Sequence, residues 1–290
     1  MNQVTNPLAI LPPRKRDACI GSVLQKMGKI TQVDAERIIQ LQKERGLRFG
    51  EAARMLGLIS DLDLEQVLAY QFDYAYLQVG QGGFSPDLVA AYQPFSEQVE
   101  TLRAIRSQLM LHWFARGRKT LVIASVLPDD EVSMLVANLA VAFSQLGEKT
   151  LLVDANLRTP HQAGIFNIRS DKGLSDILAE RANMEAIAQI EPFPDLSILQ
   201  AGTMPPNPQE LLSRVAFTRF NQEVTHNFDI VLYDVSAFST GADAFAVAAR
   251  AGGALLLARK DHTKLADIAR ASAQLRRHQV EVVGSVMLDL

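Results

Sequence analysis

Two aspartates that end short apolar runs are the residues of this sequence best placed to do chemistry. Asp154 closes the run TLLVD, and Asp234 closes the run IVLYD. Both runs have the length and the apolar character of buried strands. Parallel α/β sheets bind ligands at the carboxyl ends of their strands, so carboxylates in these positions could act on a bound ligand. The same acids could also serve only to cap buried strand ends.

The elements that must position these acids follow a regular order from residue 96 onward. Apolar runs such as TLVIAS, TLLVD, IVLYD and GALLLAR alternate with segments of helical character. This alternation predicts a parallel sheet with helices on both faces, which is the α/β class. Residues 125–133, 154–160 and 234–238 follow three of the predicted strands and are therefore expected to form the ligand-binding edge.

Composition excludes several classes of protein. The 290 residues are 48% apolar and 21% charged with a formal charge of -3, which is typical of a globular protein without general attraction for nucleic acid. One cysteine, Cys19, rules out an internal disulfide framework and a cysteine-based zinc cluster. The most apolar later stretch, residues 251–258, is far shorter than the ~20 residues of a membrane span. Residues 1–17, in which two adjacent prolines precede a basic cluster, are predicted to be a flexible tail.

An internal repeat lies near the N-terminus. Residues 19–42 align without gaps with residues 48–71, so that Gly21 pairs with Gly50. Each copy predicts a short helix that ends at a glycine, followed by a second helix with a threonine or serine as its N-cap. The sequence therefore predicts a small helical domain of two repeats over residues 18–78.

The repeats resemble the N-terminal domain of type II secretion and type IV pilus assembly ATPases. Arg48, Phe49 and Gly50 reproduce the turn of that family in the second copy, whereas the first copy keeps Gly21 but has no arginine. Because some members bind cyclic di-GMP through two such repeats, the resemblance implies a cyclic di-GMP site at these four residues. The alternative is a helical docking module, since one arginine of the pair is absent. Residues 79–95, with three glycines and two prolines, are predicted to be a linker.

Four strings in the remainder of the chain, residues 96–290, carry a second resemblance. They are VANLAVAFSQLGEKTLLVDANLRTP, GLSDIL, GTMPPNPQELL and DIVLYD, the last of which fits a Walker B motif. Their order and spacing resemble the cytoplasmic domain of bacterial tyrosine kinases that control capsule and exopolysaccharide synthesis, specifically chain-length-determinant tyrosine kinases of the EpsG type. The resemblance implies a P-loop NTPase fold of the MinD and ParA type that binds ATP with Mg²⁺.

This resemblance also implies roles for single residues. Asp234 and Ser133 would hold Mg²⁺, and Asp154 would accept the proton of an attacking tyrosine hydroxyl. Asn156 and Arg158 would belong to the second Walker motif and lie near the nucleotide.

Glu100, Arg103 and Arg106 reproduce the spacing by which these kinases assemble into rings, and on a helix that spacing places three charges on one face. The implied partner is a membrane chain-length determinant, a polysaccharide co-polymerase. We therefore expect a homo-oligomer in the cytoplasm, peripheral at the inner membrane through that partner, with no nucleic acid bound.

The predicted phosphate loop departs from the family pattern. Such a loop needs small residues, whose backbone N–H groups can face the phosphates, and a lysine. If Ser133 is the Mg²⁺-binding hydroxyl, Val132 stands at the lysine position and Glu131 at that of a glycine, with Asp129 and Asp130 before them. Each carboxylate would repel a triphosphate by on the order of 1 kcal/mol even with heavy screening. The loop therefore predicts lost or weakened kinase activity.

Three functions remain open from the sequence. The first is a kinase-like regulator of exopolysaccharide chain length, polymerisation and export whose nucleotide site has degenerated. The second is an active ATP-dependent tyrosine autokinase, although the usual tyrosine-rich tail is missing and the last tyrosine, Tyr233, is predicted to lie in the core. The third is a regulator that responds to cyclic di-GMP through the repeats.

Overall fold

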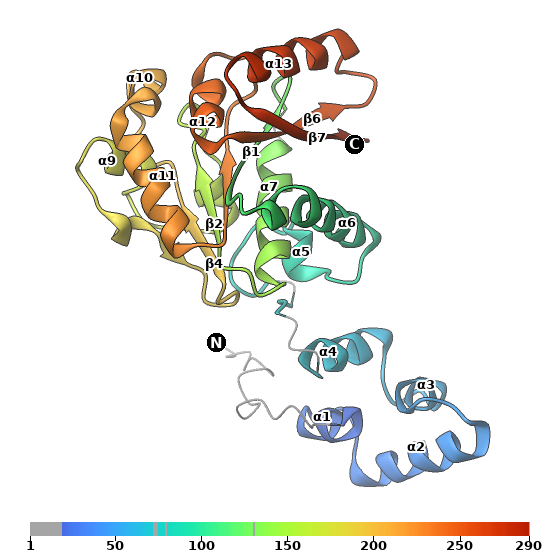
Figure 1. Ribbon diagram of the computed structural model, residues 1–290. Helices are drawn as coiled ribbons and strands as arrows, with labels where there is room; N and C mark the ends of the chain where they lie inside the picture. Colours follow the sequence, from blue (N-terminus) through green and yellow to red (C-terminus); the bar gives the residue numbers. More distant parts are fainter. Residues whose placement is uncertain (1–18, 72–74, 79, 130, 290) are drawn as a thin grey trace. The chain divides into compact units, whose positions relative to one another are not determined.

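The computed structural model describes residues 19–71, 75–78, 80–129 and 131–289. The chain divides into two compact units, Met1–Ala75 and Tyr76–Leu290 (Figure 1). Each unit has a hydrophobic core of its own. The predicted flexible tail, residues 1–17, lies outside the described residues and stays a prediction.

The two copies of the sequence repeat form equivalent helix pairs in the first unit, α1 (Ile20–Lys26) with α2 (Gln32–Arg45) and α3 (Phe49–Met55) with α4 (Asp61–Gln71). Thr31 Oγ1 accepts a hydrogen bond from the Asp34 N–H at 3.2 Å, while the Asp34 carboxylate accepts one from the Thr31 N–H at 3.0 Å. Ser60 and Asp63 make the same two bonds at 3.1 and 2.9 Å. These reciprocal caps explain where the second helix of each copy begins.

Glycines at equivalent places in the repeat allow close helix packing. A Cβ atom on Gly21 would lie 3.0 Å from the ring of Phe49, and one on Gly50 would lie 2.6 Å from the side chain of Leu64. Both glycines are buried. The packing of the first unit therefore accounts for the absence of a side chain at both positions.

A sheet of seven strands organises the described part of the second unit. In order across the sheet they are β3 (Ala188–Gln189), β4 (Leu196–Leu199), β2 (Thr150–Asp154), β5 (Ile230–Asp234), β1 (Thr120–Ser125), β6 (Gly253–Arg259) and β7 (Glu281–Leu288). All neighbours are parallel except β3, which is antiparallel to β4. The predicted sheet is thus confirmed, with one antiparallel pair at its edge.

Helices cover both faces of this sheet, which confirms the predicted α/β class (Figure 1). One face carries α5 (Val89–Tyr92), α6 (Glu97–His112) and α7 (Val132–Ser144). The other elements are α8 (Gln162–Ile165), α9 (Leu174–Leu178), α10 (Pro208–Ser213), α11 (Val215–Asn227), α12 (Asp243–Ala251) and α13 (Leu265–Arg277), with 3-10 turns η2 (Phe114–Arg116) and η3 (Met184–Ala186). Of these, α11, α12 and α13 pack on strands of the opposite face.

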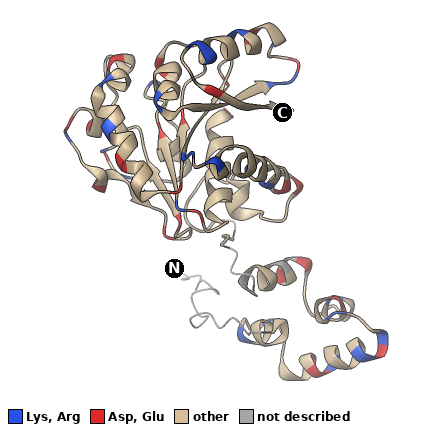
Figure 2. Ribbon diagram, in the orientation of Figure 1, with Lys and Arg blue, Asp and Glu red and all other residues tan. Residues whose placement is uncertain are grey.

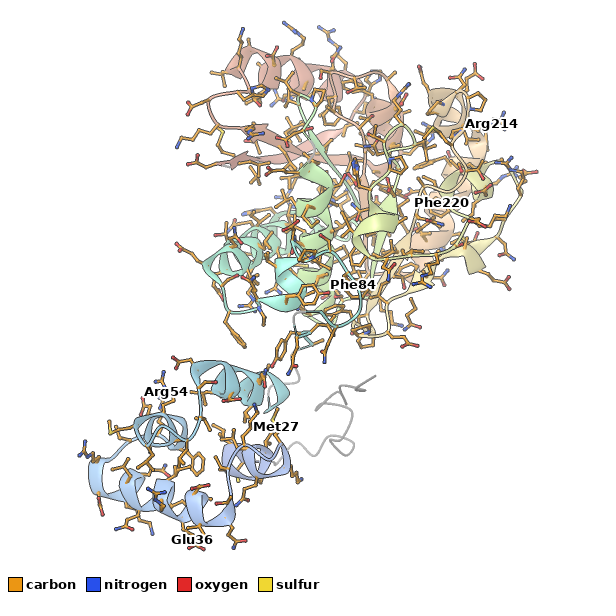
Figure 3. All side chains as sticks on the ribbon, turned by 180° about the vertical axis from the view of Figure 1, so that it is seen from behind. Met27, Glu36, Arg54, Phe84, Arg214 and Phe220 are labelled. Atoms are coloured by element: carbon orange, nitrogen blue, oxygen red, sulfur yellow. The ribbon has the colours of Figure 1, made fainter. Side chains whose placement is uncertain are left out.

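A linker is predicted over residues 79–95, but the described part of this segment, residues 80–95, belongs to the second unit. Within it, the Ala90 N–H donates to Asn138 Oδ1 at 2.8 Å, and Gln145 Nε2 donates to the Ala90 carbonyl at 2.9 Å. Phe84 lies edge to face against Phe166 with ring centroids 5.8 Å apart (Figure 3). The glycines and prolines predict a linker, but Leu88, Ala90 and Ala91 between them are buried, and α5 packs against α7.

Two of the strings that carry the kinase resemblance meet at a close backbone contact. A Cβ atom on Gly173 would lie 2.2 Å from the Gln200 carbonyl oxygen. The buried Asp176 carboxylate accepts hydrogen bonds from the N–H groups of Gly173 and Thr203 at 3.2 and 3.0 Å, and from the Thr203 hydroxyl at 3.0 Å. GLSDIL and GTMPP therefore form a structural junction between α9 and the segment that follows β4.

We expect the substitution Gly173→Ala to destabilise the second unit by about 3 kcal/mol or more, because the added methyl group would collide with backbone that cannot move away. Gly164→Ala is the matched control, since a Cβ atom there meets nothing within 4 Å. Urea unfolding of the full chain measures both. Equal stabilities of the two variants would contradict this account of the junction.

Candidate functional site

The two predicted acids lie side by side at the carboxyl edge of the sheet. Asp154 ends β2, Asp234 ends β5, and the parallel register places them directly opposite each other. Both residues are fully buried. Ser133, in the first turn of α7, is also buried, and its side chain is near enough to the Asp234 carboxylate to lower the pKa of that acid. The structure therefore brings together the three residues for which the resemblance implies catalytic and metal-binding roles.

Backbone N–H groups surround the Asp154 carboxylate. One oxygen accepts a hydrogen bond from the Asn156 N–H at 3.2 Å, and the other accepts bonds from the N–H groups of His161 and Gln162 at 3.0 and 2.9 Å. Both oxygens are thus used to hold the turn between β2 and α8. A role for Asp154 as a proton acceptor would have to compete with these bonds.

The side chain of Gln162, which the sequence analysis missed, binds the second acid. Its Nε2 donates to Asp234 Oδ2 at 2.7 Å and to the Ser133 carbonyl at 2.9 Å. Gln162 is fully buried, and its Oε1 atom and Asp234 Oδ1 have no hydrogen-bond partner within the described structure. No local sequence pattern marks Gln162, because only the fold brings it to Asp234.

The burial of two adjacent carboxylates changes their protonation. Burial, and after it the charge of Asp234, raise the pKa of Asp154 well above that of an ordinary aspartate. Burial also raises the pKa of Asp234, against the lowering effect of the neighbouring Gln162 and Ser133 side chains. Two like charges held this close cannot both ionise easily near neutral pH.

The loop between β1 and α7 has no cradle for phosphate among its described residues. Backbone nests for anions alternate right-handed and left-handed residues, but no described residue from 125 to 133 has a positive φ. The Asp129 carboxylate accepts a hydrogen bond from the Glu131 N–H at 3.0 Å, so a loop amide is already bound to the protein's own anion. Val132 is buried, whereas Glu131 is exposed. Asp130 lies outside the described residues.

The two further residues predicted near the nucleotide have partners within the protein. Asn156 closes a local turn, in which its amide donates to Thr159 Oγ1 at 3.1 Å and its carbonyl accepts from the Thr159 N–H at 3.3 Å. Arg158 forms a bidentate ion pair with Asp243 of α12 at 2.6 and 3.2 Å. The structure thus uses both side chains to order the loops at this edge.

The charges predicted to mediate ring assembly lie together on α6. Arg103 pairs with Glu100, and Arg106 donates to the Ala142 carbonyl near the end of α7 at 2.8 Å. Arg106 therefore also ties α6 to α7. Ring assembly stays a prediction.

The residues predicted to bind cyclic di-GMP belong to the first unit. Gly21 and Gly50 are accounted for by helix packing, Phe49 is half-buried against Gly21, and Arg48 is exposed at the start of α3. Binding of this nucleotide also stays a prediction.

The residues at the carboxyl edge do not fit a magnesium nucleotide. A triphosphate needs a cation and free backbone N–H groups, whereas the loop supplies Asp129, Glu131 and a buried valine. The amide of Gln162 is bonded to Asp234, the acid that would hold the metal. Within the described residues, no three histidine, cysteine, aspartate or glutamate side chains are grouped so that they could hold a metal ion.

Fold and site together define an α/β protein with a mostly parallel sheet, helices on both faces and two buried acids at the carboxyl ends of adjacent strands. No protein-family model matches the sequence. Tyrosine-protein kinase YwqD of Bacillus subtilis is 31% identical over 201 residues, which are 69% of this chain and 85% of that protein. CapB of Staphylococcus aureus, described as a tyrosine-protein kinase, is 29% identical over 195 residues, which are 67% and 86% of the two chains.

A solved structure agrees with these relatives. The crystal structure of the chimerical protein CapA2B2 is similar with a TM-score of 0.65 and 29% identity, covering 77% of this chain and 97% of its own. The chain belongs to the bacterial tyrosine-protein kinase family. The family predicted from the motifs is confirmed, whereas the EpsG type and the likeness of the repeats to secretion ATPases stay predictions.

The acid pair should make stability depend on pH. Because both carboxylates have a raised pKa in the folded state, their contribution is most favourable below the ordinary aspartate pKa of ~4 and is lost as pH rises through the folded-state values. Asp234→Asn removes one charge, so we expect it to raise the unfolding free energy at pH 8 by on the order of 2 kcal/mol and to flatten the pH dependence. Urea unfolding at pH 5 and pH 8 without Mg²⁺ measures this.

The control for that variant is Asp171→Asn, which removes an exposed carboxylate. We expect its stability to follow that of the unmodified chain at both pH values. An Asp234→Asn variant that is less stable than the unmodified chain at pH 8 would show that the pair is not under electrostatic strain.

Proposed function

We propose that this chain is a kinase-like regulator of exopolysaccharide chain length, polymerisation and export, with a degenerate nucleotide site. It acts beside a membrane chain-length determinant of the polysaccharide co-polymerase class, to which it docks at the inner membrane. Among the described residues, no helix has the length and apolar character needed to cross a bilayer. The proposal includes the EpsG-type assignment and a docking role for the helical repeats.

The main support for the proposal is the residue composition of the loop before α7. The loop has a buried valine where the resemblance places a lysine, and an acidic side chain where it places a glycine. Phosphoryl transfer depends almost entirely on positioning and on electrostatic stabilisation of the phosphates. Loss of the cation, addition of carboxylates and the Gln162–Asp234 bond all act against nucleotide binding.

Calorimetric titration of the full chain with Mg-ATP and Mg-ADP tests the proposal. We expect no binding up to millimolar nucleotide, because the loop repels phosphate. The variant Glu131→Gly/Val132→Lys/Gln162→Ala restores a glycine and a lysine to the loop and frees Asp234 from the Gln162 amide. If this variant binds nucleotide, the loop and the amide are the reason that the unmodified chain does not. Micromolar binding by the unmodified chain would instead favour the active tyrosine autokinase, whose phosphotyrosine would disappear on Asp154→Ala.

The proposed ring assembly can be tested through Glu100, which is exposed and does not hold α7 in place as Arg106 does. We expect Glu100→Lys to turn an attraction between copies into repulsion and to lower the oligomer mass measured by light scattering. Glu36→Lys, on the exposed surface of α2, is the control for a change of equal charge (Figure 3). An unchanged mass for Glu100→Lys would argue against assembly through α6.

A further inference from the structure

The outward face of α13 has an unusual composition. Its exposed residues are arginines, alanines, one leucine and Gln274, whereas Ala271 and Leu275 on the opposite side are buried. We call this the outer face of α13, and it consists of Leu265, Ala266, Ala269, Arg270, Ala273, Arg276 and Arg277. The helical period of 3.6 places these residues along one side. No carboxylate belongs to this face.

The segment around α13 is basic although the whole chain is acidic. Residues 259–278 contain six lysines and arginines and two aspartates, while the formal charge of the chain is -3. Figure 2 shows lysine and arginine along α13, which lies at the periphery of the second unit beside β6 and β7 in Figure 1. This segment therefore carries a net positive charge on the surface of a chain whose formal charge is negative.

Several of these cations are free to meet an external anion. Arg270 pairs with Asp267 at 3.3 Å and Lys260 pairs with Asp289 at 2.7 Å. No ion pair joins Arg276 or Arg277 to an acid in the described part of the chain, and both are exposed. With alanines between them, the guanidinium groups are the parts of the face that extend farthest from the helix.

We propose that the outer face of α13 binds the anionic headgroups of a phospholipid bilayer. A helix of 13 residues is about 20 Å long, so its arginines present several cations to one plane. Clusters of lysine and arginine on amphipathic helices bind anionic lipids in this way. Leu265, which is 80% exposed at the start of the helix, supplies an apolar side chain next to Lys264.

The composition favours a bilayer over a nucleic acid. Residues 259–278 contain no phenylalanine, tyrosine or tryptophan on which a base could stack. An exposed leucine gains nothing from a phosphate backbone, whereas it can enter the boundary between headgroups and acyl chains. This contact is separate from the proposed docking to a membrane partner, and it would strengthen that docking by holding the same chain to the same surface.

Co-sedimentation of the purified full chain with vesicles tests the proposal without any partner. We expect binding to vesicles of phosphatidylcholine with 30% phosphatidylglycerol, little binding to phosphatidylcholine alone, and a loss of binding as salt rises. Arg276→Glu/Arg277→Glu should reduce binding at least tenfold. Leu265→Ser should reduce it less, because it leaves the charges in place.

The matched control is Arg214→Glu/Arg219→Glu, which reverses two exposed arginines on and beside α11 of the same unit (Figure 3). It changes the net charge equally, so it should retain most of the binding. Circular dichroism and thermal melting show whether each variant is folded, and Arg270→Gln gives a milder change in the middle of the helix. Equal losses in both double variants would overturn the proposal, as would equal binding to uncharged vesicles. Tighter binding to a DNA duplex than to the anionic vesicles would assign the face to nucleic acid instead.

Discussion

Two carboxylates that are buried side by side determine how the carboxyl edge of the sheet is built. Asp154 and Asp234 end adjacent parallel strands in the same register, so neither can turn to solvent without breaking the sheet. The surrounding chain therefore supplies hydrogen-bond donors. Three N–H groups of residues 156–162 bind Asp154, and the amide of Gln162 joins Asp234 to the first turn of α7. The chain between β2 and α8 turns back on itself so that its N–H groups can reach the buried Asp154 carboxylate.

Three separate features of the loop before α7 act against the binding of a phosphate group. Its charge is negative, its described backbone forms no nest for an anion, and one of its amides already binds the Asp129 carboxylate. Val132 contributes to the buried surface of the helix instead of presenting a cation. A tyrosine-kinase fold thus surrounds a loop with different chemistry, because function depends on the residues of a site and not on the fold alone.

The sequence predicted those features that depend on neighbours along the chain. Strand ends, helix periodicity and the threonine and serine N-caps of the repeats all follow from local patterns, and Tyr233 lies in the core as its strand pattern predicts. It could not predict contacts between distant segments, such as the ion pair of Arg158 with Asp243 or the bond of Gln162 with Asp234. The same limit explains residues 79–95, because the side chains that bind this segment lie about 50 residues farther along the chain.

The attachment of residues 79–95 to α7 and α8 gives the second unit a mechanical property. Asn138 and Gln145 hold Ala90, and the Ser85 N–H donates to the Ile165 carbonyl at 2.8 Å. Any pull on the chain from the N-terminal side is thus delivered first to the helices that flank the buried acids, rather than to the sheet. Hydrogen bonds arranged in this way couple the start of the second unit to α7 and α8, the helices that lie beside the buried acids.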